Sequence, residues 1–228
     1  ALDSGAVLYT HARAVKVLIE AGRAFGVVAD LLDARGNPGG HTLRVVADRI
    51  VLACGALGTP ALLARSDLDP GAGHLGKHLR VRPWIRVLGR FDEEVRAWAE
   101  VPQSFAVDLG GDRPIRLETS FAPPAVLASE AADRGVSSRA ALAQYASLAG
   151  LAATITEEAE GEVRVGGEGR PTVRHRLADP DHAHLRFAAA RAAELLLAAG
   201  AREVFTGISA APLLRSPADL AALEAPDA

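Results

Sequence analysis

The sequence has no methionine, a single cysteine and very few lysines. Because translation starts at methionine, we expect Ala1 to be an internal residue or a processed end. The lone Cys54 excludes an intrachain disulfide and a thiolate metal cluster. Lys16 and Lys77 are the only lysines, whereas arginine and alanine are abundant. This bias favours a GC-rich bacterial gene.

The chain also lacks a strong net charge and a long apolar run. Its formal net charge is −3 and its arginines are scattered, which gives no electrostatic footprint for nucleic acid. No apolar run reaches the roughly 18 residues that a membrane span needs, and no signal peptide opens the chain. We therefore expect no transmembrane segment and a soluble, cytoplasmic protein. With 228 residues, 49% of them hydrophobic, the chain can form one large or two small domains.

Recognisable catalytic motifs are absent as well. There is no Gly-x-Ser-x-Gly elbow, no Walker loop and no Ser/His/Asp constellation. His182 and His184 are two residues apart on an expected helix, so they face different ways. His74 and His78 are four apart, but in a glycine-broken loop without a third ligand nearby. We expect no metal site and no catalytic residue in this chain.

What the sequence does contain is an apolar run at residues 50–54, Ile-Val-Leu-Ala-Cys. The run shows no polar alternation, which is typical of a strand buried on both faces of a parallel sheet. Cys54 would then be an inert core residue.

A tight turn and a helix follow this run. Gly55 and Gly58 bracket the turn, and Thr59 can cap a helix with Pro60 in its first turn. The free amides and positive dipole end of such a helix suit the phosphates or ribose of a dinucleotide. Many α/β folds use such turns only to pack a helix on a strand, so both interpretations stay open here.

Period-2 patterns before this stretch predict an antiparallel meander. Its three strands lie around residues 15–19, 25–31 and 43–47, with turns at Gly22 and at residues 37–40. A further short strand is expected at residues 6–9.

The second part of the chain reads as an antiparallel sheet with helices, beyond a glycine-rich loop at residues 71–83. Hairpin loops are expected at residues 110–112 and 166–169. The strand candidates are residues 84–91, 104–108, 115–120, 151–156, 162–165, 172–176 and 203–205. Helices should start at Ser138, with Leu142, Tyr145 and Ala149 on one face, at Asp181, ending at Gly200, and at residues 216–219.

The motif Gly55-Ala56-Leu57-Gly58-Thr59-Pro60-Ala61-Leu62-Leu63, then Ser66 and Gly76-Lys77-His78-Leu79, resembles the second signature of the glucose–methanol–choline (GMC) oxidoreductases. These are flavin enzymes that oxidise alcohols. The residues of this motif are similar to those of the bacterial branch that includes enzymes similar to long-chain alcohol oxidases and cholesterol oxidases. The resemblance implies an α/β (α+β) fold. Residues 1–79 would form part of a Rossmann-like FAD-binding domain with the meander, residues 80–215 an antiparallel substrate-binding domain, and residues 216–228 the start of a return segment.

The resemblance also implies which residues contact FAD. Ala14 takes the place of a valine whose backbone lies against the adenine, and backbone contacts tolerate that change. Ala53, Gly55, Ala56 and Thr59 form the rest of the implied cofactor contacts. Arg82 stands where the family usually has a histidine before Pro83, so local contacts near the flavin must differ.

Two family segments are missing from the sequence. A full GMC enzyme opens with Gly-x-Gly-x-x-Gly and ends with a His-Pro-x-Gly-Thr segment that carries the base histidine. We therefore expect an internal fragment of an FAD-dependent alcohol oxidase or dehydrogenase, with the base outside this chain. The alternative is a noncatalytic stand-alone binding module; an NAD(P)-dependent reductase is less favoured because nothing resembles a nicotinamide site.

The expected substrate is a small-molecule alcohol of apolar, possibly long-chain or sterol, character rather than glucose or choline. The strand faces offer mainly Val, Leu, Ile and Ala, and the few aromatic residues make a quaternary ammonium cage unsuitable. Gln103, Ser104, Thr119 and Ser120 are the polar strand residues that could face a substrate, or simply solvent.

Overall fold

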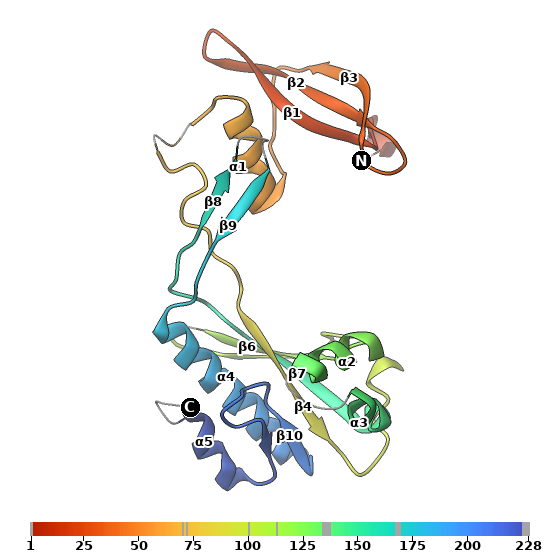
Figure 1. Cartoon of the computed structure of the whole chain (residues 1–228), viewed down its shortest axis with the longest axis vertical. Helices are drawn as coiled ribbons and strands as arrows, with labels where there is room; N and C mark the ends of the chain where they lie inside the picture. The colour runs from red at the N-terminus through yellow and green to blue at the C-terminus, as the bar shows by residue number, and fades with distance from the viewer. Residues whose placement is uncertain are drawn as a thin grey trace. The chain divides into compact units, whose positions relative to one another are not determined.

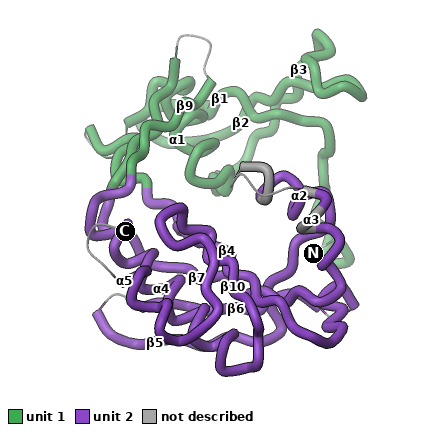
Figure 2. Tube along the Cα trace, turned by 60° about the horizontal axis from the view of Figure 1, so that its bottom comes forward, with its two compact units in different colours: residues 1–79, 160–176 green, residues 80–159, 177–228 purple. Residues whose placement is uncertain are grey.

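A computed structural model describes residues 2–69, 71, 73–99, 101–112, 114–133, 138–166 and 170–224. The chain separates into two compact units (Figure 2). Unit 1 comprises residues 1–79 and 160–176, and unit 2 comprises residues 80–159 and 177–228. The chain therefore passes between the units three times. No helix within the described ranges is both long enough and apolar enough to cross a membrane.

Unit 1 contains the predicted meander, which the structure confirms (Figure 1). Strands β1 (Ala12–Glu20), β2 (Arg23–Leu32) and β3 (Pro38–Val46) pair antiparallel in that order. Ala21 and Gly22 both have positive φ, 47° and 76°, as a two-residue hairpin turn with matching twist requires.

The turn between β2 and β3 lies earlier than predicted. Pro38 and the two glycines after it are already in β3, and the chain reverses over Asp33–Asn37 instead. The Asp33 carboxylate accepts the backbone N–H groups of Asn37 at 2.9 Å and Arg35 at 2.8 Å. These bonds, chiefly that from Asn37, lower the pKa of Asp33. An aspartate that binds its own following backbone sets this turn.

Two segments predicted as strands are unpaired. Residues 6–9 and 50–54 join no sheet in the described structure, and Val7 and Val51 are 74% and 87% exposed. Cys54 is also exposed, so the prediction of an inert core cysteine is wrong here. A parallel strand is buried only between neighbouring strands and covering helices. Among the described residues every strand pair is antiparallel, so that environment is not formed.

Helix α1 (Gly55–Arg65) packs on the meander through its last turns. Ala61 and Leu62 are each 2% exposed. Just after the helix, the Ser66 hydroxyl accepts the backbone N–H of Val17 at 2.9 Å and donates to the carbonyl of Leu62 at 2.7 Å. The buried serine therefore fixes the end of α1 to β1.

A short hairpin of β8 (Glu162–Val165) and β9 (Pro171–Arg174) completes unit 1. The sequence places it within the 80–215 substrate domain, yet it joins residues 1–79. Leu79 and Gly161 exchange backbone hydrogen bonds of 2.9 and 2.7 Å, and Val163 donates to Gly76 at 2.6 Å. Gly76 has a φ of 72°, and a Cβ there would collide with the Val163 carbonyl. Within the predicted 166–169 loop, residues 167–169 lie outside the described residues.

Unit 2 is built on a six-stranded antiparallel sheet, which confirms the sheet that the family resemblance implies. The strand order is β11-β10-β4-β7-β6-β5, and the glycine loop at residues 110–112 joins β5 to β6. The strands are β4 (Trp84–Arg90), β5 (Ala106–Leu109), β6 (Ile115–Ser120), β7 (Leu148–Ile155), β10 (Glu203–Phe205) and β11 (Leu213–Leu214).

The helices of unit 2 follow the predictions in part. The helix predicted at Ser138 does begin there but ends at Ala143, so Tyr145 and Ala149 are not on its face. Tyr145 lies in a 3-10 turn and Ala149 in β7, because the strand takes over at Leu148. The described α-helices of this unit are α2 (Pro124–Asp133), α3 (Ser138–Ala143), α4 (Asp179–Ala198) and α5 (Ala221–Glu224). Short 3-10 turns are Leu2–Ser4 in unit 1 and Ala97–Ala99, Tyr145–Ser147 and Pro217–Leu220 in unit 2.

Helix α4 covers one face of the sheet and forms the main core with it. Its contact surface is a row of alanines, including Ala188, Ala189, Ala192 and Ala193, each completely buried. Small side chains let the helix lie close to the strands. The strand residues beneath it are Ile115, Leu117, Leu151, Ile155 and Val87. The apolar strand side chains that predicted a substrate surface are therefore largely used in this core.

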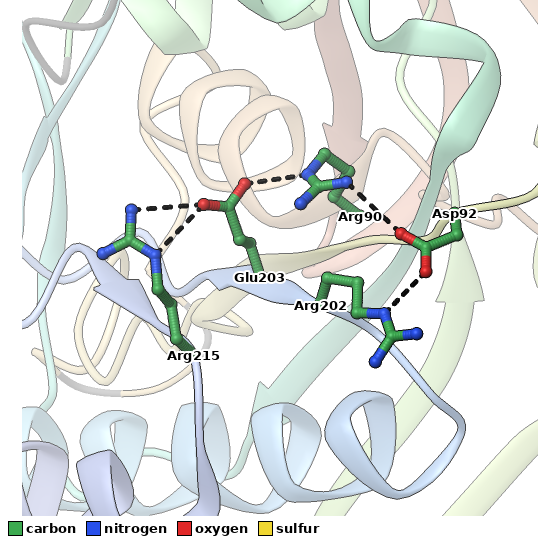
Figure 3. A network of polar contacts seen from close by, with 5 residues as sticks. All are labelled: Arg90, Asp92, Arg202, Glu203 and Arg215. Atoms are coloured by element: carbon green, nitrogen blue, oxygen red, sulfur yellow. Dashed lines mark hydrogen bonds and ion pairs between the residues drawn. The ribbon is translucent and has the colours of Figure 1, made fainter.

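A chain of ion pairs crosses the β4–β10–β11 end of the sheet (Figure 3). The Glu203 carboxylate binds Arg90 at 2.8 Å and Arg215 at 3.2 Å. Asp92 binds Arg202 at 2.7 Å and lies 3.9 Å from Arg90. The hydrogen bond from Arg90, followed by that from Arg215, lowers the pKa of Glu203 below its ordinary value of 4.5.

This lowered pKa predicts a small acid sensitivity of unit 2. A carboxylate with a lowered folded pKa stabilises the fold above its unfolded pKa, and that contribution disappears as the pH falls through the folded pKa. The free energy of unfolding of the wild-type protein should thus exceed that of Glu203→Gln by about 1 kcal/mol at pH 7, since the pair is partly exposed. This difference should disappear once the pH falls below the folded pKa of Glu203. Urea unfolding at several pH values measures it. A stability difference between wild type and Glu203→Gln that stays constant with pH would contradict the stabilising role of the Glu203 carboxylate. Substitution of the exposed Glu93 by Gln is the control and should show no such pH dependence.

Candidate functional site

The N-terminal turn of α1 presents exposed backbone to solvent. Gly55 has a φ of 76°, and no atom lies within 4 Å of the place that a Cβ would take. No side chain caps the helix, and Ala53, Gly55 and Ala56 are exposed. Unpaired amides and the positive helix end favour an anionic or strongly polar ligand at this turn.

Thr59 has a different role from the predicted one. The helix already begins at Gly55, so Thr59 is not its cap, and Pro60 lies inside the helix. The Thr59 hydroxyl instead accepts the backbone N–H of Cys54 at 3.2 Å. Pro60 has no N–H to donate to the carbonyl of Ala56, which keeps the first turn loosely bonded. Because Gly55 adopts a left-handed conformation, the helix begins at Gly55 and not after Thr59, where the sequence predicted its cap.

Ala14 belongs to a different element from the other predicted cofactor residues. It sits in β1 beside a bulge, and its carbonyl accepts a 3.4 Å hydrogen bond from Arg65 in the last turn of α1. Ala53, Gly55, Ala56 and Thr59 cluster at the opposite end of this helix, which is about 16 Å long for eleven residues. The structure therefore brings four of the five predicted residues together at the start of α1 and connects Ala14 to the helix through Arg65.

A second polar cluster was missed by the sequence argument. His74 Nδ1 lies 3.2 Å from His78 Nε2, and His78 Nδ1 lies 2.6 Å from the Glu160 carboxylate. The sequence argument expected no third ligand near these histidines, and it did not foresee Glu160, which contacts His78 from 82 residues along the chain. Spacing within the loop could not reveal this partner.

The cluster lines an open groove of about 690 Å³ within unit 1. Beside it, Lys77 binds Glu162 at 2.7 Å, and this bond, with one from Arg164, lowers the pKa of Glu162. Arg174 and Arg176 also line the groove. The groove therefore carries both charge signs, and its acidic residues Glu160 and Glu162 bind His78 and Lys77.

The polar strand residues of unit 2 mostly serve the sheet itself. Gln103 donates its backbone N–H to Thr119 at 2.8 Å, and the Thr119 hydroxyl accepts the N–H of Phe105 at 3.3 Å. The Ser120 hydroxyl lies 3.5 Å from Arg86 Nε, while Ser104 is exposed. Gln103, whose side chain also donates to Glu118 at 3.4 Å, Thr119 and Ser120 therefore each have a structural partner, which explains these polar residues without a substrate site.

Arg86 is a polar residue that the sequence argument overlooked. It is 8% exposed, forms an ion pair with Glu130 of α2, and its guanidinium lies 5.1 Å from the centre of the Trp84 ring. The available signal was an arginine among apolar residues of β4, where alternation would put it on the face away from α4.

Comparison with known proteins shows that the chain is similar to GMC oxidoreductases. Residues 1–84 match the model of the GMC oxidoreductase family. An uncharacterised GMC-type oxidoreductase of Mycobacterium tuberculosis H37Rv is 37% identical over 221 residues, which is 96% of this chain and 34% of that protein. Another, from Sinorhizobium fredii, is 35% identical over 91% of this chain and 40% of its own length.

A plant protein extends the comparison. The long-chain-alcohol oxidase of Arabidopsis thaliana is 29% identical over 90% of this chain and 29% of its own length. The chain spans about a third of the length of the curated relatives it matches.

Proposed function

Because the chain belongs to the GMC oxidoreductase family, we propose that it is one part of an FAD-dependent enzyme that oxidises the CH–OH group of an alcohol. FAD, when bound, supplies an acceptor for the hydride that leaves the carbinol carbon. The family's His-Pro-x-Gly-Thr segment does not occur in this sequence. We therefore assign the base histidine to a region outside this chain. The chain itself would bind and position the cofactor and the alcohol, and would not exchange the proton.

The observation that carries this proposal is the uncapped, exposed N-terminal turn of α1. The residues fit a dinucleotide: the backbone of Ala53, Gly55 and Ala56 can contact phosphate or ribose oxygens, with Thr59 holding the turn. Ala14 in β1 would contact the adenine through its backbone. Residues 50–54 would complete the Rossmann-like sheet as its last parallel strand. Such a strand needs neighbours to bury Val51, which is 87% exposed here.

We propose an apolar alcohol as substrate, and the similarity to the plant long-chain-alcohol oxidase supports it. On the face of the sheet away from α4, Leu88 and Leu148 form a small apolar cluster with Ala122 and Leu127. The test uses the complete protein that contains this chain, loaded with FAD, with decanol, a sterol, choline and glucose in competition. Decanol or the sterol should have the highest kcat/KM. Glucose or choline at the top would exclude an apolar site, and absence of any flavin spectrum would refute the proposed function itself.

The cofactor assignment predicts that Gly55→Val weakens FAD binding by about tenfold. A β-branched residue at a φ of 76° costs roughly 1–2 kcal/mol and occupies space beside the helix amides. The neighbouring Cys54→Ser is the matched control and should retain flavin, because serine has nearly the size of cysteine and leaves the backbone of the turn unchanged. Fluorescence titration of FAD onto the apoprotein measures both affinities. Equal losses of FAD affinity in the two variants would show that the turn at Gly55 is not part of the cofactor site.

A further inference from the structure

The hydrogen bonds of the His74–His78–Glu160 cluster indicate which nitrogen of His78 carries a lone pair that can accept a hydrogen bond. An ionised carboxylate only accepts, so the 2.6 Å contact with Glu160 places the proton on His78 Nδ1. The lone pair of His78 Nε2 then faces His74 Nδ1, 3.2 Å away. Two imidazole nitrogens thus meet in an open groove, and with His78 neutral one proton, donated by His74 Nδ1, joins them.

A metal ion can take the place of that proton. Zinc binds imidazole nitrogen at about 2.0–2.1 Å, so nitrogens 3.2 Å apart correspond to a ligand angle of roughly 100° at the metal. A histidine ligand that donates its other ring N–H to a carboxylate is the usual support of such sites. Glu160 already holds His78 in this way.

We propose that His74 Nδ1 and His78 Nε2 form a binding site for a divalent transition metal ion that prefers imidazole, such as Zn²⁺ or Ni²⁺. Glu160 is a positioning residue, and water fills the remaining coordination positions. Among the described side chains no group of three or more His, Cys, Asp or Glu can hold a metal, so this is a two-ligand site of modest affinity. It is independent of the proposed alcohol oxidation.

The surrounding charges set the selectivity of the site. Hard cations such as Mg²⁺ and Ca²⁺ need several oxygen ligands, and the nearby Glu162 is already bound to Lys77. Arg174 and Arg176 in the same groove add positive charge that a weakly bound ion cannot overcome. Only ions with strong intrinsic affinity for imidazole should therefore bind.

Calorimetric titration of the full chain with ZnCl₂ and NiCl₂ tests the site. A Cys54→Ser background removes the exposed thiol as a competing ligand. We expect one equivalent to bind, with the affinity reduced at least about tenfold in His74→Ala and His78→Ala, and about tenfold in Glu160→Gln. His41→Ala, an exposed histidine on β3, is the matched control and should bind normally. MgCl₂ should give no binding.

Two outcomes would overturn the proposal: no binding of either ion, or binding that survives both histidine substitutions. Circular dichroism of each variant establishes that it is folded. Because His78 is 58% exposed and Glu160 40%, their side chains can be replaced without opening a core. Heat denaturation gives a second measurement, since an ion bound only to the folded chain raises its melting temperature.

Discussion

Asp181→Ala should lower the free energy of unfolding of unit 2 by about 3–5 kcal/mol, because three buried backbone donors lose their acceptor at about 1–3 kcal/mol each, part of which water can recover. Asp181 lies in the first turn of α4 and is completely buried. Its carboxylate accepts three backbone N–H groups, from Glu158 at 2.7 Å and from Ala159 and Ala178 at 3.1 Å. Alanine would leave all three donors without this acceptor, and each costs free energy when shielded from water.

The position of these donors explains why the carboxylate matters to the architecture. Residues 158–159 lead out of unit 2 into the hairpin segment 160–176, and Ala178 lies where the chain has returned. Asp181 therefore ties both ends of this excursion to the start of α4. Loss of the carboxylate should loosen the two connections together, in addition to the helix N-terminus.

Asp179→Ala is the matched control, because Asp179 is in the same helical turn but exposed. Removing it costs only its interaction with the helix dipole, about 0.3–1 kcal/mol. Both tryptophans, Trp84 and Trp98, belong to unit 2, so their fluorescence during urea unfolding reports on that unit alone. Equal destabilisation by the two substitutions would show that the buried hydrogen bonds carry no special weight.

Local patterns predicted the elements whose stabilising contacts are local. The period-2 meander, the alanine-rich α4 and the cap at Ser216, where Asp219 accepts the serine N–H at 2.9 Å, were readable because each depends on neighbours a few residues away. The turn between β2 and β3 was predicted a few residues too late, because the Asp33 side chain binds the following backbone and sets the turn there. These cases show that periodicity and capping chemistry were sufficient within single elements.

Contacts between distant residues could not be read in the same way. The run at residues 50–54 has the composition of a buried strand, but composition does not state which strands lie beside it. The β8–β9 hairpin pairs within itself, and its unit is decided by contacts with Gly76 and Leu79. For the candidate site, the turn at Gly55 was predicted and Glu160 beside His78 was not, because nothing at position 160 marks it as a partner of position 78.

Glu130→Ala should be the second severe substitution, destabilising unit 2 by about 3–5 kcal/mol. Glu130 is the ion-pair partner of Arg86, whose side chain is only 9% exposed. Beyond Glu130, Arg86 has a 3.5 Å contact with Ser120 and the face of Trp84. Neither supplies a negative charge, so removal of Glu130 leaves a buried cation without compensation and removes the ion pair between α2 and β4.

The double substitution Arg86→Met with Glu130→Leu separates the charge effect from packing. Replacing a buried pair by apolar residues of similar size is often neutral or stabilising, so the double variant should be more stable than Glu130→Ala alone. The pair Arg116–Asp108, 41% and 65% exposed on the same sheet, is the matched control, and Asp108→Ala should destabilise the protein much less than Glu130→Ala because solvent screens this pair. If Glu130→Ala cost no more than Asp108→Ala, water would have to reach Arg86 readily. The ion pair would then be a surface contact that does not hold α2 on the sheet.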